Sequence, residues 1–145
     1  VEILRRNADE IERRVGARLV VRKIAVRDLA KPRPDGIDRA LLTDDPYAVL
    51  DDPSVEIVAE LVGGVEPART WIQEALARGK NIVTANKELM AKDGHPLMET
   101  AAAARRDFFL EGSVAGGIPI IAAMKESLAA NRVHEVLGVV NGTTN

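Results

Sequence analysis

Apolar and polar positions along this chain follow two periods in turn, that of an amphipathic helix and that of a buried strand. Residues 1–15 place apolar side chains every three or four positions, which predicts a helix already under way at the first residue. The stretch RLVVRKIAV at 18–26 is rich in β-branched residues and predicts a strand. Residues 27–54 hold four of the seven prolines, so we expect a long connection with one helical turn near 47–50.

Residues 55–140 repeat the order strand, turn, helix. We expect a strand ending in two glycines at 55–64, a helix at 65–78, a strand at 81–85, helical segments at 86–92 and 95–106 broken at DGHP, a strand at 107–112, a glycine-rich turn leading into a helix at 113–132, and a strand at 133–140. Short apolar strands that alternate with amphipathic helices are typical of a parallel sheet covered on both faces. The pattern predicts an α/β protein with a doubly wound parallel sheet.

Composition narrows what such a sheet would bind. A chain of 145 residues, 46% of them hydrophobic, is long enough for one ordinary domain with its own core. Its 20 Lys and Arg nearly balance its 22 Asp and Glu, so we expect a small-molecule partner and no nucleic acid. The lack of cysteine excludes disulfides and thiolate metal sites and makes the cytoplasm the expected location. No apolar run approaches the roughly 20 residues that cross a bilayer, so we expect no membrane partner.

The two ends of the chain predict a fragment. The first helix starts without a preceding Ser, Thr, Asp or Asn to cap it. The last residues, VVNGTTN, stop in turn-type residues just after an apolar strand. We therefore expect a doubly wound sheet that is truncated at both ends.

The residues that follow each predicted strand are the candidates for function, because ligands bind at the carboxyl ends of strands in an open parallel sheet. Arg27 and Asp28 follow the first strand, where an acid would take the ribose hydroxyls or an arginine a 2′-phosphate. The two residues are equally consistent with a solvated charge pair that opens a loop. We take Arg27 as a candidate cofactor ligand, and the choice between NAD and NADP stays open. The glycines of LVGG at 61–64 let the backbone approach a ligand and aim its N–H groups at a phosphate or ribose, although any tight turn needs glycine.

A lysine, Lys87, follows the strand at 81–85 and opens the next helix. That end of a helix is partially positive, so a cation there is unusual. Lys87 is either a solvent-facing side chain beside Glu88 or a group placed for proton transfer. Asn86 or Thr84 can cap the helix.

Two further stretches are rich in turn residues. EGSVAGGIPII at 111–121 has three glycines within six residues before Pro119. It predicts either a turn whose irregularly directed carbonyls coordinate a hard cation or a plain strand-to-helix turn. NGTTN at 141–145 forms either a simple turn or a pocket of hydroxyls and amides for a small polar substrate.

With ELVGG, IVTANK, EGSVAGGIPII and VNGTTN in this order and at these separations, the chain resembles the homoserine dehydrogenase family over essentially its whole length. The resemblance implies a partial Rossmann-type NAD(P)-binding domain at 1–133. It implies, at 134–145, the first strand and hinge of a catalytic domain. The activity implied is the interconversion of L-homoserine and L-aspartate 4-semialdehyde with NAD or NADP, in the pathway to threonine, isoleucine and methionine.

The same resemblance implies roles for single residues. Lys87 is expected to border both cofactor and substrate and to share in proton transfer at the reacting oxygen while a hydride moves to or from the nicotinamide. Val62 and Gly63 would line the cofactor cleft, and Gly142 and Thr143 would meet homoserine. The main-chain oxygens expected around a sodium ion are those of Glu111, Val114, Gly116 and Ile118.

The departures from the family pattern set the limits of this interpretation. Family members begin with a strand and a glycine-rich loop and end in a catalytic domain with a second lysine and a dimer-forming sheet, none of which lies in these 145 residues. We therefore expect this chain to be inactive alone and the complete protein to be a homodimer. The alternatives are another Rossmann-type oxidoreductase, similar to the glucose–fructose oxidoreductase group, a non-catalytic nucleotide-binding regulatory domain, or part of a fusion with aspartokinase.

Overall fold

The computed structural model describes residues 1–138, which fall into two compact units that divide between Val55 and Glu56. Each unit has a parallel sheet of its own, with two strands in the first and three in the second. The α/β class with parallel strands and flanking helices is thus confirmed. The stretch 1–133, which the sequence treats as one domain, contains the boundary between the two units. None of the helices within residues 1–138 has the length and apolar character needed to cross a membrane.

The first unit is mostly connection with short elements. Its elements are α1 (Glu2–Arg6), α2 (Ala8–Val15), β1 (Ile24–Ala25), η1 (Arg39–Leu41), β2 (Leu42–Thr43) and α3 (Tyr47–Leu50). The expected opening helix is interrupted at Asn7, and Gly16 ends it in the left-handed conformation that a residue without Cβ adopts readily. The helical turn expected near 47–50 is confirmed as α3. The strand expected at 18–26 forms only at β1, whose partner β2 was not predicted.

Polar contacts hold α3 against β1 in this unit. Lys23 donates a hydrogen bond from Nζ to the Ala48 carbonyl at 3.0 Å and pairs with the Asp52 carboxylate at 3.1 Å. Asp52 also accepts hydrogen bonds from the Ser54 hydroxyl at 2.7 Å and the Ser54 N–H at 2.9 Å. The Ser54 hydroxyl and N–H, together with Lys23, hold the pKa of Asp52 well below its usual range. This carboxylate therefore joins the chain on both sides of α3.

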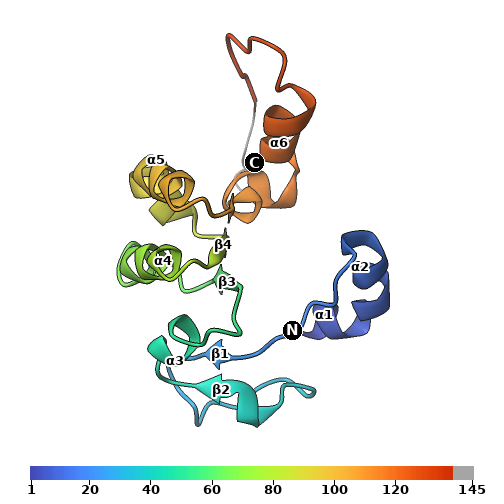
Figure 1. Ribbon diagram of the computed structural model, residues 1–145, viewed down its shortest axis with the longest axis vertical. Helices are drawn as coiled ribbons and strands as arrows, with labels where there is room; N and C mark the ends of the chain where they lie inside the picture. Colours follow the sequence, from blue (N-terminus) through green and yellow to red (C-terminus); the bar gives the residue numbers. More distant parts are fainter. Residues whose placement is uncertain (139–145) are drawn as a thin grey trace. The chain divides into compact units, whose positions relative to one another are not determined.

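The second unit repeats strand, helix, strand along the chain. Its elements are β3 (Ile57–Glu60), α4 (Ala68–Ala77), β4 (Asn81–Thr84), α5 (Lys87–Ala103), β5 (Phe108–Phe109), η2 (Glu111–Ser113), η3 (Ala115–Gly117), α6 (Ile120–Ala122) and η4 (Ala123–Ser127). The three strands are parallel and ordered β3-β4-β5. Figure 1 shows α4 and α5 on the same side of β3 and β4. The buried apolar residues of this layer are Ala68, Ile72, Ala75, Leu76, Ile82, Leu89, Leu97 and Ala101.

The opposite face of this sheet is exposed. Ile57, Val83 and Phe109, which alternate with the buried strand positions, are all exposed large hydrophobic residues. We expected helices on both faces of the sheet. Among the described residues, α4 and α5 pack on one face only.

One predicted break is absent from the structure. The sequence predicts two helical segments separated at DGHP, but α5 runs without interruption from Lys87 to Ala103 with Pro96 inside it. Proline removes one backbone hydrogen bond from a helix interior, and its ring crowds the preceding turn. Here the buried face made by Leu89, Leu97 and Ala101 packs on α4 and outweighs that local cost. The prediction of a break was wrong because packing, which the local pattern does not report, decides this helix.

The region after β5 differs from its prediction as well. The glycine-rich turn and the helix that follows Pro119 are confirmed, but the helix ends at Ser127 rather than near 132. Residues 133–138 contain no strand. The remainder of the strand expected at 133–140 lies outside the described residues, and the domain boundary expected at 133 stays a prediction.

Candidate active site

The carboxyl ends of β3 and β4 meet in a buried polar pair. The parallel register sets Glu60 directly beside Thr84, and the Thr84 hydroxyl donates to the Glu60 carboxylate at 2.7 Å. Glu60 is 4% exposed and Thr84 1%. Burial of a carboxyl group is costly unless hydrogen bonds replace its water, and the N–H groups of Val62 at 2.7 Å and Gly63 at 3.2 Å supply two more. Three donors from two segments therefore converge on one side chain.

Asn86 links the same edge to the helix that follows. Its N–H donates to the Thr84 hydroxyl at 3.1 Å, and its side-chain oxygen accepts from the Leu89 N–H at 3.1 Å, so it caps α5 as the sequence predicts. Its side-chain amide nitrogen donates to the Gly64 carbonyl at 2.6 Å. One buried amide thus connects the loop after β3 with the start of α5.

Lys87 is the first residue of α5 and is exposed. The neighbouring Glu88 is paired with Lys92, one turn further along the helix, at 2.6 Å. Within residues 1–138 the Lys87 side chain makes no hydrogen bond or ion pair, so its ammonium group is available to a ligand at this edge. The backbone of Lys87 is fixed by the Asn86 cap, whereas its side chain is free.

The turn after β5 lies against the same strand end. The Ser113 hydroxyl donates to the Thr84 carbonyl at 3.0 Å. A Cβ added at Gly112 would come within 3.2 Å of the Ala85 Cβ, so this close approach favours a glycine there. The segment predicted to bind a cation therefore begins next to the residues that precede Lys87.

The loop after β3 is exposed at the position expected for a cofactor. Val62 is 50% exposed, and Gly63 has a φ of 80° with open space where a Cβ would lie. We expected the N–H groups of this loop to face a phosphate or ribose. Those of Val62 and Gly63 instead donate to Glu60, which fits the tight turn that the sequence also allows. The Val62 side chain and the Cα of Gly63 remain the surfaces that a cofactor can contact.

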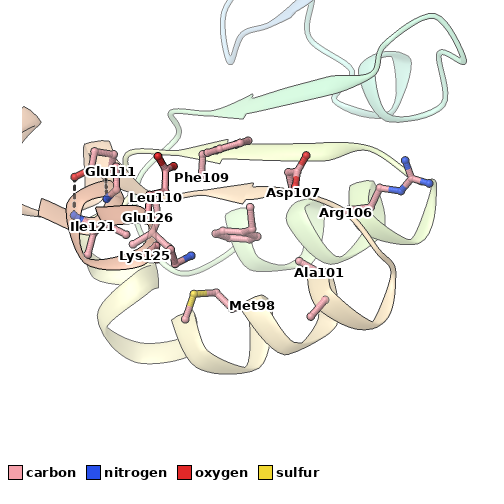
Figure 2. A pocket seen from close by; sticks show the side chains of 13 residues that line it. Met98, Ala101, Arg106, Asp107, Phe109, Leu110, Glu111, Ile121, Lys125 and Glu126 are labelled. Atoms are coloured by element: carbon pink, nitrogen blue, oxygen red, sulfur yellow. Dashed lines mark hydrogen bonds between the residues drawn. The ribbon is translucent and has the colours of Figure 1, made fainter. Parts of the chain in front are cut away.

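The predicted cation loop has an irregular backbone. Ala115 and Gly116 have φ values of 52° and 61°, which turn successive carbonyls away from the directions of a regular helix or strand. The Glu111 carboxylate accepts from the N–H groups of Ile121 at 3.0 Å and Ala122 at 2.8 Å and so caps α6 (Figure 2). The main-chain oxygen of Glu111 accepts from Val114, and that of Ile118 from Ile120. A carbonyl has two lone pairs, so these contacts leave room for a cation.

The remaining predicted residues belong to other parts of the chain. Arg27 is exposed and follows β1 in the first unit, while Val62, Gly63 and Lys87 belong to the second. Beside it, the Asp28 carboxylate accepts from the Ala30 N–H at 2.8 Å, a local turn. Gly142 and Thr143 lie outside the described residues.

Comparisons with known proteins show which protein family contains this chain. The family model for the NAD-binding domain of homoserine dehydrogenase matches residues 1–111. The chain belongs to the homoserine dehydrogenase family.

Relatives match the chain along nearly all of its length. It is 41% identical to the homoserine dehydrogenase of Bacillus subtilis over 100% of this chain and 34% of that protein. It is 44% identical to that of Corynebacterium glutamicum over 94% of this chain and 31% of that protein. The chain thus spans about a third of the length of these relatives.

Solved structures of homoserine dehydrogenases are also similar to this chain. A homoserine dehydrogenase from Thiobacillus denitrificans matches with a TM-score of 0.80 and 48% identity, covering 90% of this chain and 30% of that one. The S. aureus enzyme at pH 7.5 matches with a TM-score of 0.73 and 36% identity over 79% of this chain and 30% of that one. The Rossmann-type NAD-binding fold is therefore confirmed. A glucose–fructose oxidoreductase-like protein is not favoured.

A pocket of about 290 Å³ lies elsewhere in this homoserine dehydrogenase domain. It is lined by Met98 and Ala101 of α5, by β5, and by Ile121 and Lys125 beyond it (Figure 2). Neither Lys87 nor the loop after β3 contributes to it. Within residues 1–138, no group of three or more His, Cys, Asp or Glu side chains is arranged to hold a metal. Of the predicted site residues, Glu111 of the expected cation loop lines this pocket, whereas Val62, Gly63 and Lys87 do not.

Sequence reasoning missed one member of the edge entirely. Glu60 stands at the end of an apolar strand, and the sequence treats that strand simply as buried. A lone acid at the last position of a buried strand, followed by two glycines, is the signal that could have singled it out. Thr84 was noted only as a possible cap, yet its hydroxyl bonds both Glu60 and Asn86.

Proposed function

We propose that the full-length protein containing this chain is a homoserine dehydrogenase that interconverts L-homoserine and L-aspartate 4-semialdehyde with NAD or NADP, in the biosynthesis of threonine, isoleucine and methionine. The observation that carries the proposal is a family match over residues 1–111 combined with an unpaired Lys87 at the carboxyl end of β4. In an open parallel sheet this end of the strands is where ligands bind.

The residues present fit a nicotinamide cofactor at this edge. Val62 is exposed there, and the missing side chain of Gly63 leaves open space beside the loop. The cofactor, when bound, supplies the acceptor or donor of a hydride. In our proposal Val62 and Gly63 contact it, Lys87 borders it, and Arg27 takes the 2′-phosphate when the cofactor is NADP.

Oxidation of the homoserine alcohol releases one hydride and one proton. We assign the proton step to Lys87, whose ammonium or amine group would hold the reacting oxygen and exchange its proton. The hydride leaves the carbon atom that carries this oxygen and passes to the cofactor, so the alcohol becomes an aldehyde. The proton passes to Lys87. Gly142 and Thr143 are proposed to contact the amino acid part of the substrate.

A sodium ion is proposed for the loop at 111–118. The consecutive positive φ values of Ala115 and Gly116 support it, because such a backbone departs from regular helix and strand geometry, and main-chain carbonyl oxygens are ligands that hard cations accept. The oxygens proposed are the main-chain atoms of Glu111, Val114, Gly116 and Ile118. The ion would supply a fixed positive charge that stabilises the loop beside the end of β4. The complete protein is proposed to be a homodimer.

The proposed activity is tested with the purified full-length protein. We expect formation of reduced cofactor that depends on L-homoserine, with D-glucose giving none. Glucose-dependent reduction without homoserine activity would favour the glucose–fructose oxidoreductase-like alternative. Binding of cofactor with no turnover of either substrate would favour a regulatory domain.

The sodium site has a separate test. Exhaustive exchange of sodium for a large organic cation should lower both the melting temperature and the activity of the full-length protein, and added sodium should restore them. If neither the melting temperature nor the activity changes on exchange, the loop is a plain turn and the sodium proposal is wrong.

A further inference from the structure

Glu60 is a buried carboxyl group to which the proposed chemistry gives no task. Its side chain is 4% exposed, at the last position of β3. Its three recorded donors are the Val62 N–H, the Gly63 N–H and the Thr84 hydroxyl. A carboxylate accepts hydrogen bonds on both oxygens, and here one oxygen serves the loop and the other serves β4. Glu60 therefore connects the loop after β3 with the end of β4.

We propose that Glu60, acting through Thr84 and Asn86, is the positioning residue that holds the cofactor loop and Lys87 in one fixed arrangement. The proposal rests on the proposed function, which gives Lys87 and the loop their roles. Glu60 itself touches neither cofactor nor substrate. It acts by fixing the backbone on both sides of the site.

The contacts form a closed circuit. One path runs from the Val62 N–H through Glu60 and the Thr84 hydroxyl to the Asn86 N–H. A second path returns from the Asn86 amide to the Gly64 carbonyl at 2.6 Å. The loop after β3 is therefore tied twice to the residue that immediately precedes Lys87. A shift of either segment has to break or lengthen one of these bonds.

Such a circuit matters for a hydride and proton transfer because both steps depend on geometry. Displacement of a reacting group by about 1 Å can lower a rate by about 10²-fold. The circuit fixes only the backbone of Lys87, which leaves the side chain free to follow the substrate. A network that served stability alone would change the melting temperature and leave the kinetic constants of the folded enzyme as they are.

The test uses the full-length protein with paired substitutions at Thr84. Thr84→Val keeps the branched shape and removes the hydroxyl, whereas Thr84→Ser keeps the hydroxyl. We expect Thr84→Val to raise the cofactor KM and lower kcat, each about 10-fold, as the geometric argument implies. Thr84→Ser should return both constants to within about threefold of the unsubstituted protein, since both hydrogen bonds are restored.

A control substitution at the other end of β4 distinguishes an effect on the geometry of the site from an effect on the stability of the fold. The Asn81 side chain accepts a hydrogen bond from the Asp107 N–H at 3.0 Å, at the amino ends of β4 and β5. Asn81→Ala should lower the melting temperature without changing kcat or the cofactor KM. If Thr84→Val behaves like Asn81→Ala, the network only stabilises the fold and the proposal is wrong.

Two further arms keep the result decisive. If Thr84→Val does not fold, Glu60→Gln replaces it, because the amide nitrogen can only donate to the Thr84 oxygen and leaves the Thr84 hydroxyl proton without its acceptor, while the amide oxygen still serves the loop. Kinetic changes in the same direction are expected. If the unsubstituted protein does not oxidise homoserine, the proposed function fails. The cofactor dissociation constant, measured by fluorescence titration with reduced cofactor, then decides the positioning proposal: weaker binding in Thr84→Val supports it, and equal binding contradicts it.

Discussion

The carboxyl-terminal edges of the two sheets in this molecule have similar sequence signals and different structures. At the ends of β3 and β4, buried side chains join segments 22 to 29 residues apart in the chain. At the end of β1, Asp28 is bonded to residues only two and five positions away, and the neighbouring Arg27 is exposed. The first end is a fixed assembly of several segments, whereas the second is a local turn.

The two edges suit two kinds of ligand contact, one that needs precise geometry and one that does not. An edge built from long-range buried contacts can hold atoms in the precise geometry that a chemical step requires. An exposed arginine on a local turn can pair with a phosphate without such precision, because a charge-assisted contact tolerates more movement. We therefore expect chemistry to depend on the first edge and cofactor preference on the second.

The largest effect is expected at Lys87. Lys87→Ala in the full-length protein should lower kcat by about 10²–10⁴-fold with little change in melting temperature, because a positioned acid–base group is lost. Lys92→Ala is the matched control, since Lys92 is an exposed lysine of the same helix that is paired with Glu88. Steady-state kinetics with homoserine measure both. Similar kcat values for the two variants would make Lys87 an ordinary surface residue.

The second effect concerns the end of β1. Arg27→Ala should raise the KM for NADP by about 10–100-fold, the equivalent of one hydrogen-bonded charge contact, and leave the KM for NAD within a factor of about two. The two cofactors serve as each other's control in the same preparation. Equal changes for both would show that Arg27 does not contact the 2′-phosphate.

The third effect compares two glycines. Gly63 and Gly79 have φ values of 80° and 75°, so replacement of either by alanine imposes a similar backbone cost of about 1–2 kcal/mol. Both variants should therefore lose melting temperature. Only Gly63→Ala should also raise the cofactor KM, by several-fold, because only Gly63 lies in the loop bonded to Glu60. A raised KM in Gly79→Ala would show that the kinetic effect follows stability.

The smallest effect concerns the first unit and pH. The pKa of Asp52 is lowered in the folded state by the Ser54 hydroxyl and N–H and by Lys23, so its ionised form stabilises the fold above pH about 4. That stabilisation is lost as the pH falls below this value. Asp52→Asn should lower the melting temperature by about 2–4 °C at pH 7 and by less at pH 3. Asp44→Asn, at an exposed carboxyl group of the same unit, should change it by less at both values.

Much of the fold was predictable because it follows from local periodicity. The order of β3, α4 and β4 and the position of Lys87 follow from apolar spacing and from glycines at the turns. The continuity of α5 through Pro96 was not predictable, because the packing of its buried face on α4 outweighs a local signal. The strand β2 was missed because it has only two residues within a proline-rich connection.

The site was predictable residue by residue but not as an assembly. Lys87 and the glycines after β3 could be named from their positions after strands, Val62 from the resemblance to the family, and the Asn86 cap from its place before a helix. Glu60 could be singled out as an acid in a buried strand, but its role could not, because that role depends on the register that places it beside Thr84. Register between strands that are 24 residues apart is a property of the folded sheet and not of any single stretch.

The most direct measurement of the central claim, that one network positions the cofactor loop and Lys87 together, is a double-substitution cycle. The dissociation constant of reduced cofactor is measured for the full-length protein with Glu60→Gln, with Thr84→Val, and with both. Substitutions that break the same hydrogen-bonded unit do not add, so the double variant should bind no more weakly than Thr84→Val alone, within about twofold. Losses that multiply in the double variant would mean that Glu60 and Thr84 act independently and would contradict the account.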